Sequence, residues 1–220
     1  MNITPESVKE LLKSEDFGER IRGINQLRQL ESSMAFEMVQ PLIKDANTRV
    51  RYAAVSQLDT LGKHDLEKSL ELLRDRLFND SEPDVQAAAA DAIGGLKLTV
   101  AFEDLEKVYH QTNEWLLQMS IIATLGELGD PRGFELLQEA ITSDNSLLKT
   151  AAIGSFGELG DERAVSLLTP LASDPDWQIR HRLAQALGRL GGTEANFTLE
   201  KLTTDEIEQV ALEAKNNLSK

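Results

Sequence analysis

The chain of 220 residues contains no cysteine. Disulfide bonds, a thiolate nucleophile and a thioether anchored on this chain are therefore excluded. Basic residues are also scarce, since 23 Lys and Arg stand against 37 Asp and Glu, for a formal net charge of -14. Binding to nucleic acid or to an anionic membrane relies on dense Lys and Arg, so neither is an expected partner. We expect a protein or a small ligand instead.

Long apolar runs are absent as well. No run approaches the roughly 20 apolar residues that span a bilayer, and the first residues, MNITPE, have neither the basic nor the apolar region of a signal peptide. We therefore predict a cytoplasmic protein without membrane insertion. A composition of 41% hydrophobic and 27% charged residues is typical of an ordinary folded chain.

Histidine is rare too, with three in the chain. The residues that follow the histidines at positions 64, 110 and 181 are Asp, Gln and Arg, so the chain has no His-Glu pair. A lone histidine does not make a metal site. We expect His64 and His110 to be surface residues near helix ends. No nucleophile motif, phosphate-binding glycine loop or metal-ligand spacing is present, so the sequence predicts no metal site.

What the sequence does contain is a repeat. The stretch LGELGD at 125–130 returns as FGELGD at 156–161, 31 residues later. Further copies lie at 58–62, 93–97 and 187–191. Such a period is the signature of stacked repeats. We therefore predict one repeat domain over residues 1–220.

Each copy closes a helix, and an apolar residue upstream of it serves as position 0 of its repeat. These residues are Val50, Val85, Leu117, Leu148, Ile179 and Val210. Apolar or small residues recur at offsets 0, 3, 4, 8 and 11, which lie on one stripe of a helix. The second helix of each repeat is thus predicted to be the more packed one.

The complete pattern predicts an all-α, right-handed α-α superhelix of about seven helical hairpins, with the second helices on the concave side. Thr4 as N-cap and Pro5 at the first helical position open the first hairpin. The expected helix pairs are 5–13 with 17–30, 34–44 with 48–61, 65–78 with 83–96, 100–110 with 114–128, 131–142 with 146–159, 162–172 with 175–190, and 193–202 with 205–218.

The repeated pattern x-Val-Arg-x-Ala-Ala-x-x-Leu-Gly-x-Leu-Gly-Asp resembles the HEAT-like repeats named after phycobilisome lyases. The non-repetitive segments ITPESV, RVRYAAVSQ, TNEWL and PDWQIR extend this resemblance over the whole chain, toward the phycobilisome-degradation proteins of that family. The resemblance implies a homologue of the two-subunit phycocyanin bilin lyases. It implies phycobiliproteins as partners and phycocyanobilin as ligand or substrate, with no required cofactor. It assigns no catalytic residue.

Helical phase also predicts where a ligand would lie. Offsets -2, +2, +5 and +9 should point to the concave face at ~100° per residue. Both tryptophans, Trp115 and Trp177, occupy offset -2, and offset +2 holds Tyr52, Met119 and His181. Glycines at offset +9 (Gly94, Gly126, Gly157 and Gly188) would form a shallow floor for a flat conjugated molecule. The alternatives are that these glycines allow close helix packing and that the tryptophans brace neighbouring repeats.

Cations gather at the starts of the second helices, where backbone N–H groups already favour anions. They are Arg49, Arg51, Lys149, Arg180, His181 and Arg182. Paired arginines suit the two propionates of a bilin. Alternatively, Arg51 and Arg180 pair with an aspartate of a neighbouring turn, such as Asp45, Asp80 or Asp174. Arg182 occupies the position at which other repeats have a small residue, namely Ala53, Ala88, Ser120 and Ala151. A long, charged side chain is unexpected at this position.

Two functions remain open. The first is a bilin-handling protein, either a lyase that cleaves a cysteinyl thioether or a carrier of the released pigment. Elimination of a thiol requires one proton taken from the pigment and one delivered near sulfur, which suits a histidine and a carboxylate. His181 with Glu114 is the candidate pair. The second function is a non-catalytic scaffold whose concave face binds a protein.

The negative net charge leads to a first testable prediction. With a net charge of -14, the chain should not shift DNA in a gel at physiological salt, because nothing would release the phosphate counterions. A tight, salt-resistant complex would contradict the assignment of a protein or small-molecule partner.

Overall fold

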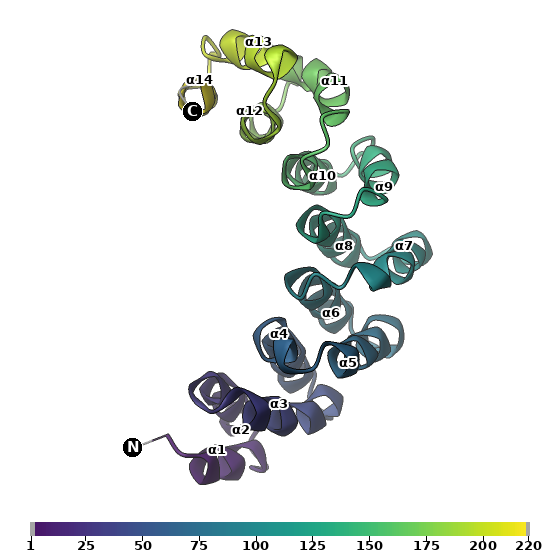
Figure 1. Ribbon diagram of the computed structural model, residues 1–220, viewed down its shortest axis with the longest axis vertical. Coiled ribbons are helices and arrows are strands. Elements are labelled where there is room, and N and C mark those ends of the chain that lie inside the picture. Colours follow the sequence, from purple (N-terminus) through teal and green to yellow (C-terminus); the bar gives the residue numbers. More distant parts are fainter. Residues whose placement is uncertain (1–2, 219–220) are drawn as a thin grey trace. The chain divides into compact units, whose positions relative to one another are not determined.

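The computed structural model describes residues 3–218, and all regular structure in that range is helical, with no strand. Figure 1 shows the helices in chain order. They are α1 (Pro5–Leu12), α2 (Phe17–Gln26), α3 (Ser32–Val39), α4 (Thr48–Leu61), α5 (Leu66–Asn79), α6 (Pro83–Gly95), α7 (Phe102–Gln111), α8 (Trp115–Leu128), α9 (Gly133–Ala140), α10 (Ser146–Leu159), α11 (Ala164–Leu168), α12 (Trp177–Leu190), α13 (Thr193–Leu202) and α14 (Glu208–Leu218). The prediction of an all-α stack of about seven hairpins is confirmed.

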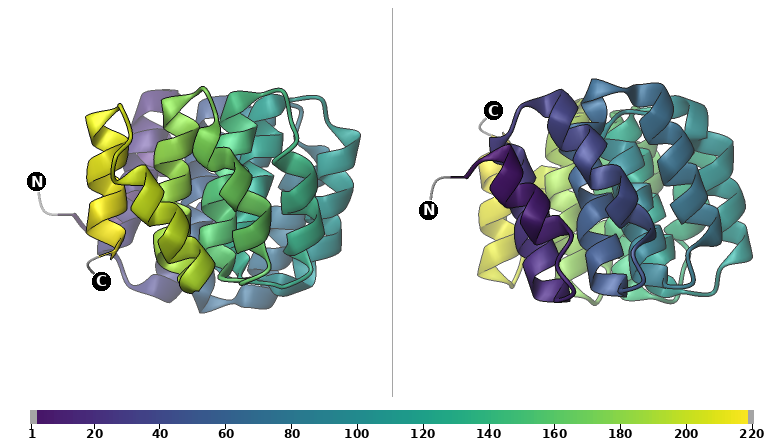
Figure 2. Two further views of the ribbon diagram at one scale, coloured as in Figure 1. Left: turned by 90° about the horizontal axis from the view of Figure 1, so that it is seen from above. Right: turned by 90° about the horizontal axis from the view of Figure 1, so that it is seen from below.

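Contacts divide the chain into two compact units, residues 1–121 and 122–220, and the boundary falls within α8. Each unit has two layers. The second helices pack directly on one another, as α2, α4 and α6 in the first unit and α10, α12 and α14 in the second. First helices of successive hairpins touch less, so the second helices form the inner layer of each unit. Figure 2 shows the hairpin turns gathered at the two ends of the helices.

Proline explains where two first helices differ from the prediction. The helices expected to reach residues 44 and 172 end as α-helices at Val39 and Leu168 and continue as 3₁₀ turns, Gln40–Lys44 and Thr169–Ser173. Pro41 and Pro170 stand at the second position of these turns. Proline has no N–H to donate to the carbonyl four residues back, so it ends the α-helical ladder.

One side chain organises the turn before each inner helix. Its oxygen accepts a hydrogen bond from the backbone N–H two residues later, over 2.8–3.2 Å. The residues are Ser14, Asp45, Asp80, Thr112, Ser143, Asp174 and Asp205. Asp and Ser/Thr favour such turns because their side chains replace a backbone acceptor. These residues therefore fix where each inner helix begins.

Arginines at offset +1 tie successive hairpins together through these turns. Arg51 Nε lies 2.9 Å from Asp80 Oδ2, and Arg180 Nε lies 2.7 Å from Asp205 Oδ2. Each guanidinium also donates to a backbone carbonyl of its own turn, that of Asp45 or Asp174. Arg20 joins Asp45 in the same way. The structural alternative for Arg51 and Arg180 is therefore confirmed, and neither guanidinium is free to meet a ligand.

The buried ion pairs shift the pKa values of their members. Arg180 lowers the pKa of the Asp205 carboxyl by hydrogen bonding, against the opposing effect of burial. At Asp80, burial acts to raise the pKa, but hydrogen bonds from Arg51 and the Glu82 backbone bring it below the ordinary value. Both carboxylates are therefore held ionised by the fold.

Replacing Arg180 by Gln should lower the free energy of unfolding by about 3 kcal/mol, because it leaves Asp205 ionised without its partner. Only 8% and 7% of the two side chains are exposed. Since the folded-state pKa of Asp205 is depressed, this loss should be complete above about pH 4 and should shrink as the pH falls through the folded pKa. Urea unfolding from pH 7 to pH 3 measures it. A difference that does not depend on pH would contradict this account of the pair.

Candidate functional site

The inner helices are buried over a wider stripe than helical phase predicted. Position 0 and offsets +4 and +8 are buried, as expected. Offset +5, predicted to face the concave surface, is fully buried at Val55, Ala90, Ile122, Ile153 and Ala184. That prediction is wrong because each inner helix packs against an outer helix and also against inner helices of neighbouring repeats. Only a narrow stripe of each inner helix remains accessible.

The predicted glycine floor is also wrong. A Cβ on Gly126 would lie 2.6 Å from the Cα of Ser155, and one on Gly157 would lie 2.9 Å from the Cα of Ala186. A Cβ on Gly188 would collide with Asn217. These glycines let α8, α10, α12 and α14 approach closely, as the packing alternative held. No open groove floor is left at offset +9 of these helices.

Aromatic side chains nevertheless remain exposed where inner helices begin. Trp115 is the first residue of α8 and Trp177 the first of α12, with exposed fractions of 47% and 40%. Phe17 begins α2 in the same way and is 41% exposed, a position that sequence reasoning missed. Tyr52, on the first turns of α4, is 47% exposed. Large apolar surface that is left open at one repeated position favours a binding role.

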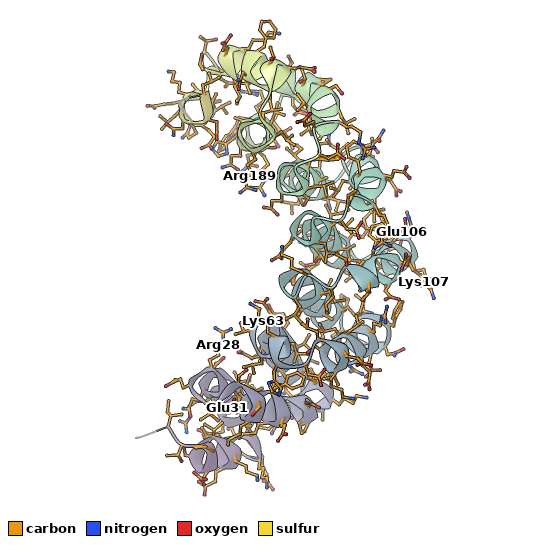
Figure 3. The ribbon with its side chains drawn as sticks, in the orientation of Figure 1. Arg28, Glu31, Lys63, Glu106, Lys107 and Arg189 are labelled. Carbon is orange, nitrogen blue, oxygen red and sulfur yellow. The ribbon has the colours of Figure 1, made fainter. Side chains whose placement is uncertain are left out.

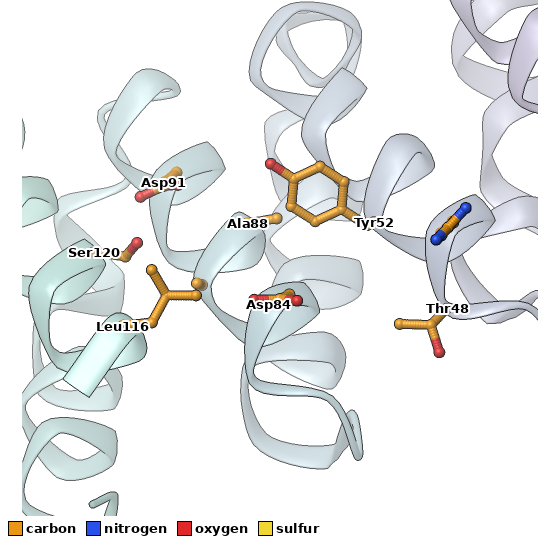
Figure 4. A pocket seen from close by; sticks show the side chains of 9 residues that line it. Thr48, Tyr52, Asp84, Ala88, Asp91, Leu116 and Ser120 are labelled. Atoms are coloured by element: carbon orange, nitrogen blue, oxygen red, sulfur yellow. The ribbon is translucent and has the colours of Figure 1, made fainter. Parts of the chain in front are cut away.

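In the first unit, a pocket of about 400 Å³ lies between α4, α6 and α8 (Figure 4). It brings together two predicted ligand residues, Tyr52 and Arg49. Its lining is Thr48, Arg49, Tyr52, Asp84, Ala87, Ala88, Asp91, Leu116 and Ser120. The predicted residues Trp115 and Met119 also lie on α8 but do not line this pocket.

Asp84 and Asp91 were not predicted as site residues. They are seven residues apart on α6, which places them on one face of that helix. This spacing was visible in the sequence. Helical phase assigned offsets -2, +2, +5 and +9 to the accessible face, whereas Asp84 and Asp91 lie at offsets -1 and +6.

In the second unit, α12 carries a cluster of predicted residues. The rings of Trp177 and His181 are 6.3 Å apart, edge to face. His181 Nε2 lies 3.9 Å from Glu213 Oε2 on α14, a carboxylate that sequence reasoning missed. Glu114, the predicted partner of His181, precedes α8 and belongs to the first unit. The catalytic roles of His181 and Glu114 stay predictions.

Arg182 has a setting unlike that of the arginines at offset +1. Its guanidinium lies against Gly154 of α10, where any Cβ would collide with it, and Nη1 donates to Gln185 over 3.1 Å. Its Nε is buried without a hydrogen-bond partner. No carboxylate within residues 3–218 pairs with it. Gly154 thus makes room for a cation whose charge is uncompensated.

Charges outside these sites are mostly paired or solvated. Arg189 of α12 meets Glu158 of α10 over 2.9 Å. Figure 3 shows Arg28 and Lys63 on the inner side of the first unit and Glu106 and Lys107 on its outer side. His64 and His110 are exposed, as predicted. In residues 3–218 no group of three or more acidic or histidine side chains could hold a metal ion, and no helix is long and apolar enough to cross a membrane.

Comparisons with known proteins agree with this architecture. The model of HEAT repeats matches residues 4–80, 70–155 and 135–219. A comparison with curated protein sequences finds no match.

Solved structures show the same fold at low identity. The complex of CpcE and CpcF of phycocyanin lyase from Nostoc contains a chain that is 20% identical, with a TM-score of 0.66 over 100% of this chain and 95% of that one. YibA from Escherichia coli is 17% identical, with a TM-score of 0.66 over 98% and 81%. An archaeal HEAT-like repeats protein from Thermococcus onnurineus is 17% identical, with a TM-score of 0.60 over 100% and 97%. At these identities the likeness concerns the fold.

The tight glycine contacts make the second unit's packing testable. Gly157→Ala should destabilise the protein, although Ala is the better helix former by about 1 kcal/mol, because its Cβ would meet the backbone of Ala186. Gly133→Ala is the matched control, since its Cβ would be 3.4 Å from the nearest atom of Leu125. Thermal unfolding should show a lower Tm for the first variant and little change for the second. Equal Tm values would show that α10 and α12 can separate without cost.

Proposed function

We infer a binding function from the family to which this chain belongs, the HEAT repeats. Stacked helical repeats present extended surfaces on which other proteins dock. We propose that the partner is a phycobiliprotein and that the inner helices contact its bilin pigment. The sequence resemblance to phycobilin lyases, and in particular to the phycobilisome-degradation protein called non-bleaching protein B, supports this choice. The shared fold with a phycocyanin lyase chain is consistent with it.

The observation that carries the proposal is the exposure of Trp177 beside His181 and an uncompensated Arg182. A half-exposed indole offers a flat face on which a conjugated pigment can stack. Arg182 follows Trp177 by five residues on the same helix, and its planar guanidinium suits a carboxylate. A bilin propionate would supply the negative charge that Arg182 lacks. The cluster on α12 therefore fits an acidic, flat, conjugated ligand.

Pigment detachment is the finer part of the proposal. Cleavage of a cysteinyl thioether by elimination breaks the carbon–sulfur bond, removes a proton from the adjacent carbon and returns a proton to sulfur, so that a thiol and a new double bond result. His181 would take the proton as a general base; its Nε2 lies 3.9 Å from Glu213 Oε2.

A scaffold without chemistry is the second candidate. Arg51 and Arg180 favour it, because their ion pairs hold them in the turns. Of the arginines predicted to bind a ligand, Arg49 and Arg182 make no ion pair in the described residues. Under this reading the aromatic side chains at the helix starts contact the partner protein itself. The two candidates differ in whether free pigment binds.

Free phycocyanobilin should change its absorbance on mixing with the protein and should quench tryptophan fluorescence. Trp177→Ala and Arg182→Gln should each weaken binding by about ten-fold, because one removes a stacking face and the other a charge-assisted hydrogen bond. Arg163→Gln is the matched control, since Arg163 is exposed, lies just before α11 and already pairs with Asp161.

Circular dichroism should show the helix content of all three variants unchanged. Mixing with intact phycocyanin then separates the candidates: release of pigment supports the lyase reading, and complex formation without release supports the scaffold. If both α12 variants bind pigment as tightly as the parent protein, the α12 cluster is not the bilin site.

A further inference from the structure

The second unit carries a row of exposed apolar side chains across three successive inner helices. Leu147 lies in the first turn of α10, Trp177 begins α12 and Leu212 lies early in α14. Their exposed fractions are 53%, 40% and 56%. In this unit α10 packs directly on α12, and α12 packs on α14 (Figure 1). The row therefore crosses the unit near the starts of its inner helices.

Helical phase and two contacts place these side chains on one surface. They stand at offsets -1, -2 and +2 of their helices, within about 100° of one another around the helix axis. The Trp177 ring contacts that of His181 at offset +2. His181 in turn approaches Glu213, the neighbour of Leu212 in the chain. Trp177 and Leu212 therefore border the same accessible surface, which Leu147 continues on α10.

Arg182 provides an independent sign of a partner beside this row. Gly154 follows Leu147 by seven residues, so it lies on the same face of α10, two turns or about 10 Å further along. The Arg182 guanidinium covers Gly154. Its Nη1 donates to Gln185, whereas its Nε is buried without a hydrogen-bond partner. A cation without a counterion therefore stands about 10 Å to one side of the apolar row.

The acids on these helices are engaged elsewhere. Glu213 accepts a hydrogen bond from Asn217 over 2.9 Å and approaches His181 on α12. Glu158 pairs with Arg189 over 2.9 Å. Within residues 3–218 no carboxylate pairs with Arg182. Because a half-buried charge without a counterion costs free energy, an acidic group of a partner would be favoured here.

The spacing of the row selects the shape of the partner. Packed helices have axes about 8–10 Å apart, so the exposed side chains of the row repeat at about 10 Å. In an α-helix seven residues make about two turns, advance about 10.5 Å and return to the same face. In an extended strand three residues advance about 10 Å, but the third points to the opposite face. A helix laid across α10, α12 and α14 therefore matches the row, and a strand does not.

We propose that this face binds an amphipathic helix of a partner protein, with apolar residues seven positions apart and an acidic residue on the flank beside Arg182. The middle apolar residue packs on Trp177 and the outer two pack on Leu147 and Leu212. The carboxylate accepts hydrogen bonds from the guanidinium. This inference rests on the proposed binding function and names the segment that is bound. Trp177 and Arg182 are shared with the bilin proposal, so a helix and free pigment compete for α12, whereas Leu147 and Leu212 serve the helix alone.

The test uses the full-length protein and a labelled alanine-based peptide of about 20 residues, long enough to form a helix, followed by fluorescence anisotropy. The peptide carries three leucines at a spacing of seven and one glutamate four residues after the first leucine. Leu147→Ser/Leu212→Ser should weaken its binding by at least about ten-fold, because two apolar contacts are lost, and should leave the binding of free phycocyanobilin unchanged. Arg182→Gln should weaken the glutamate peptide by about ten-fold and should not weaken the same peptide with glutamine in place of glutamate.

The matched control is Leu66→Ser/Phe197→Ser, which removes two exposed apolar side chains from the outer helices α5 and α13 and should leave the affinity unchanged. A peptide of the same composition with its leucines out of the seven-residue spacing should bind more weakly. The proposal is overturned if the first peptide does not bind, if the rearranged peptide binds equally well, if the control variant weakens binding as much, or if Arg182→Gln weakens the glutamine peptide equally. Pigment binding without peptide binding leaves only the bilin site standing, and peptide binding without pigment binding leaves only the helix site.

Discussion

The close approach of successive inner helices is the constraint on which the rest of the structure depends. In the second unit, Gly126, Gly157 and Gly188 place the backbone of one inner helix against Ser155, Ala186 and Asn217 of the next. Packing at this distance buries both flanks of each inner helix. What remains for a ligand is a narrow stripe near the helix starts, where Trp115, Trp177 and Tyr52 are exposed.

Ion pairs between repeats hold several arginines of the inner helices in place, so these arginines are not available to a ligand on the accessible stripe. Arg20, Arg51 and Arg180 each reach the aspartate of the following turn. In the middle of the chain both partners change together: Gln86 and Gln118 take the place of arginine, and the following turns carry Thr112 and Ser143 in place of aspartate. The glutamines donate to carbonyls of their own hairpin instead. In these two repeats, the residue at offset +1 and the residue of the following turn therefore differ together from the Arg–Asp pattern.

The accessible stripe carries different side chains in the two units. On α12 it presents the indole of Trp177 and the imidazole of His181. Arg182 lies beside them against Gly154 of α10. Between α4, α6 and α8 it presents two carboxylates, a phenol and the hydroxyl of Ser120. A repeat architecture allows this division, because each repeat contacts mainly its neighbours and its exposed positions can vary independently.

By itself the sequence determined the helical hairpins, their boundaries to within a few residues and the position of both tryptophans at the starts of inner helices. These depend on periodicity, capping and turn residues, which are local. Only the tertiary structure decided what lies on each flank of an inner helix. It buried offset +5, turned the glycines into helix contacts, committed Arg51 and Arg180 to turns, and set Glu213 beside His181. Contacts between repeats join residues about 30 positions apart, and the phase of a single helix carries no information about them.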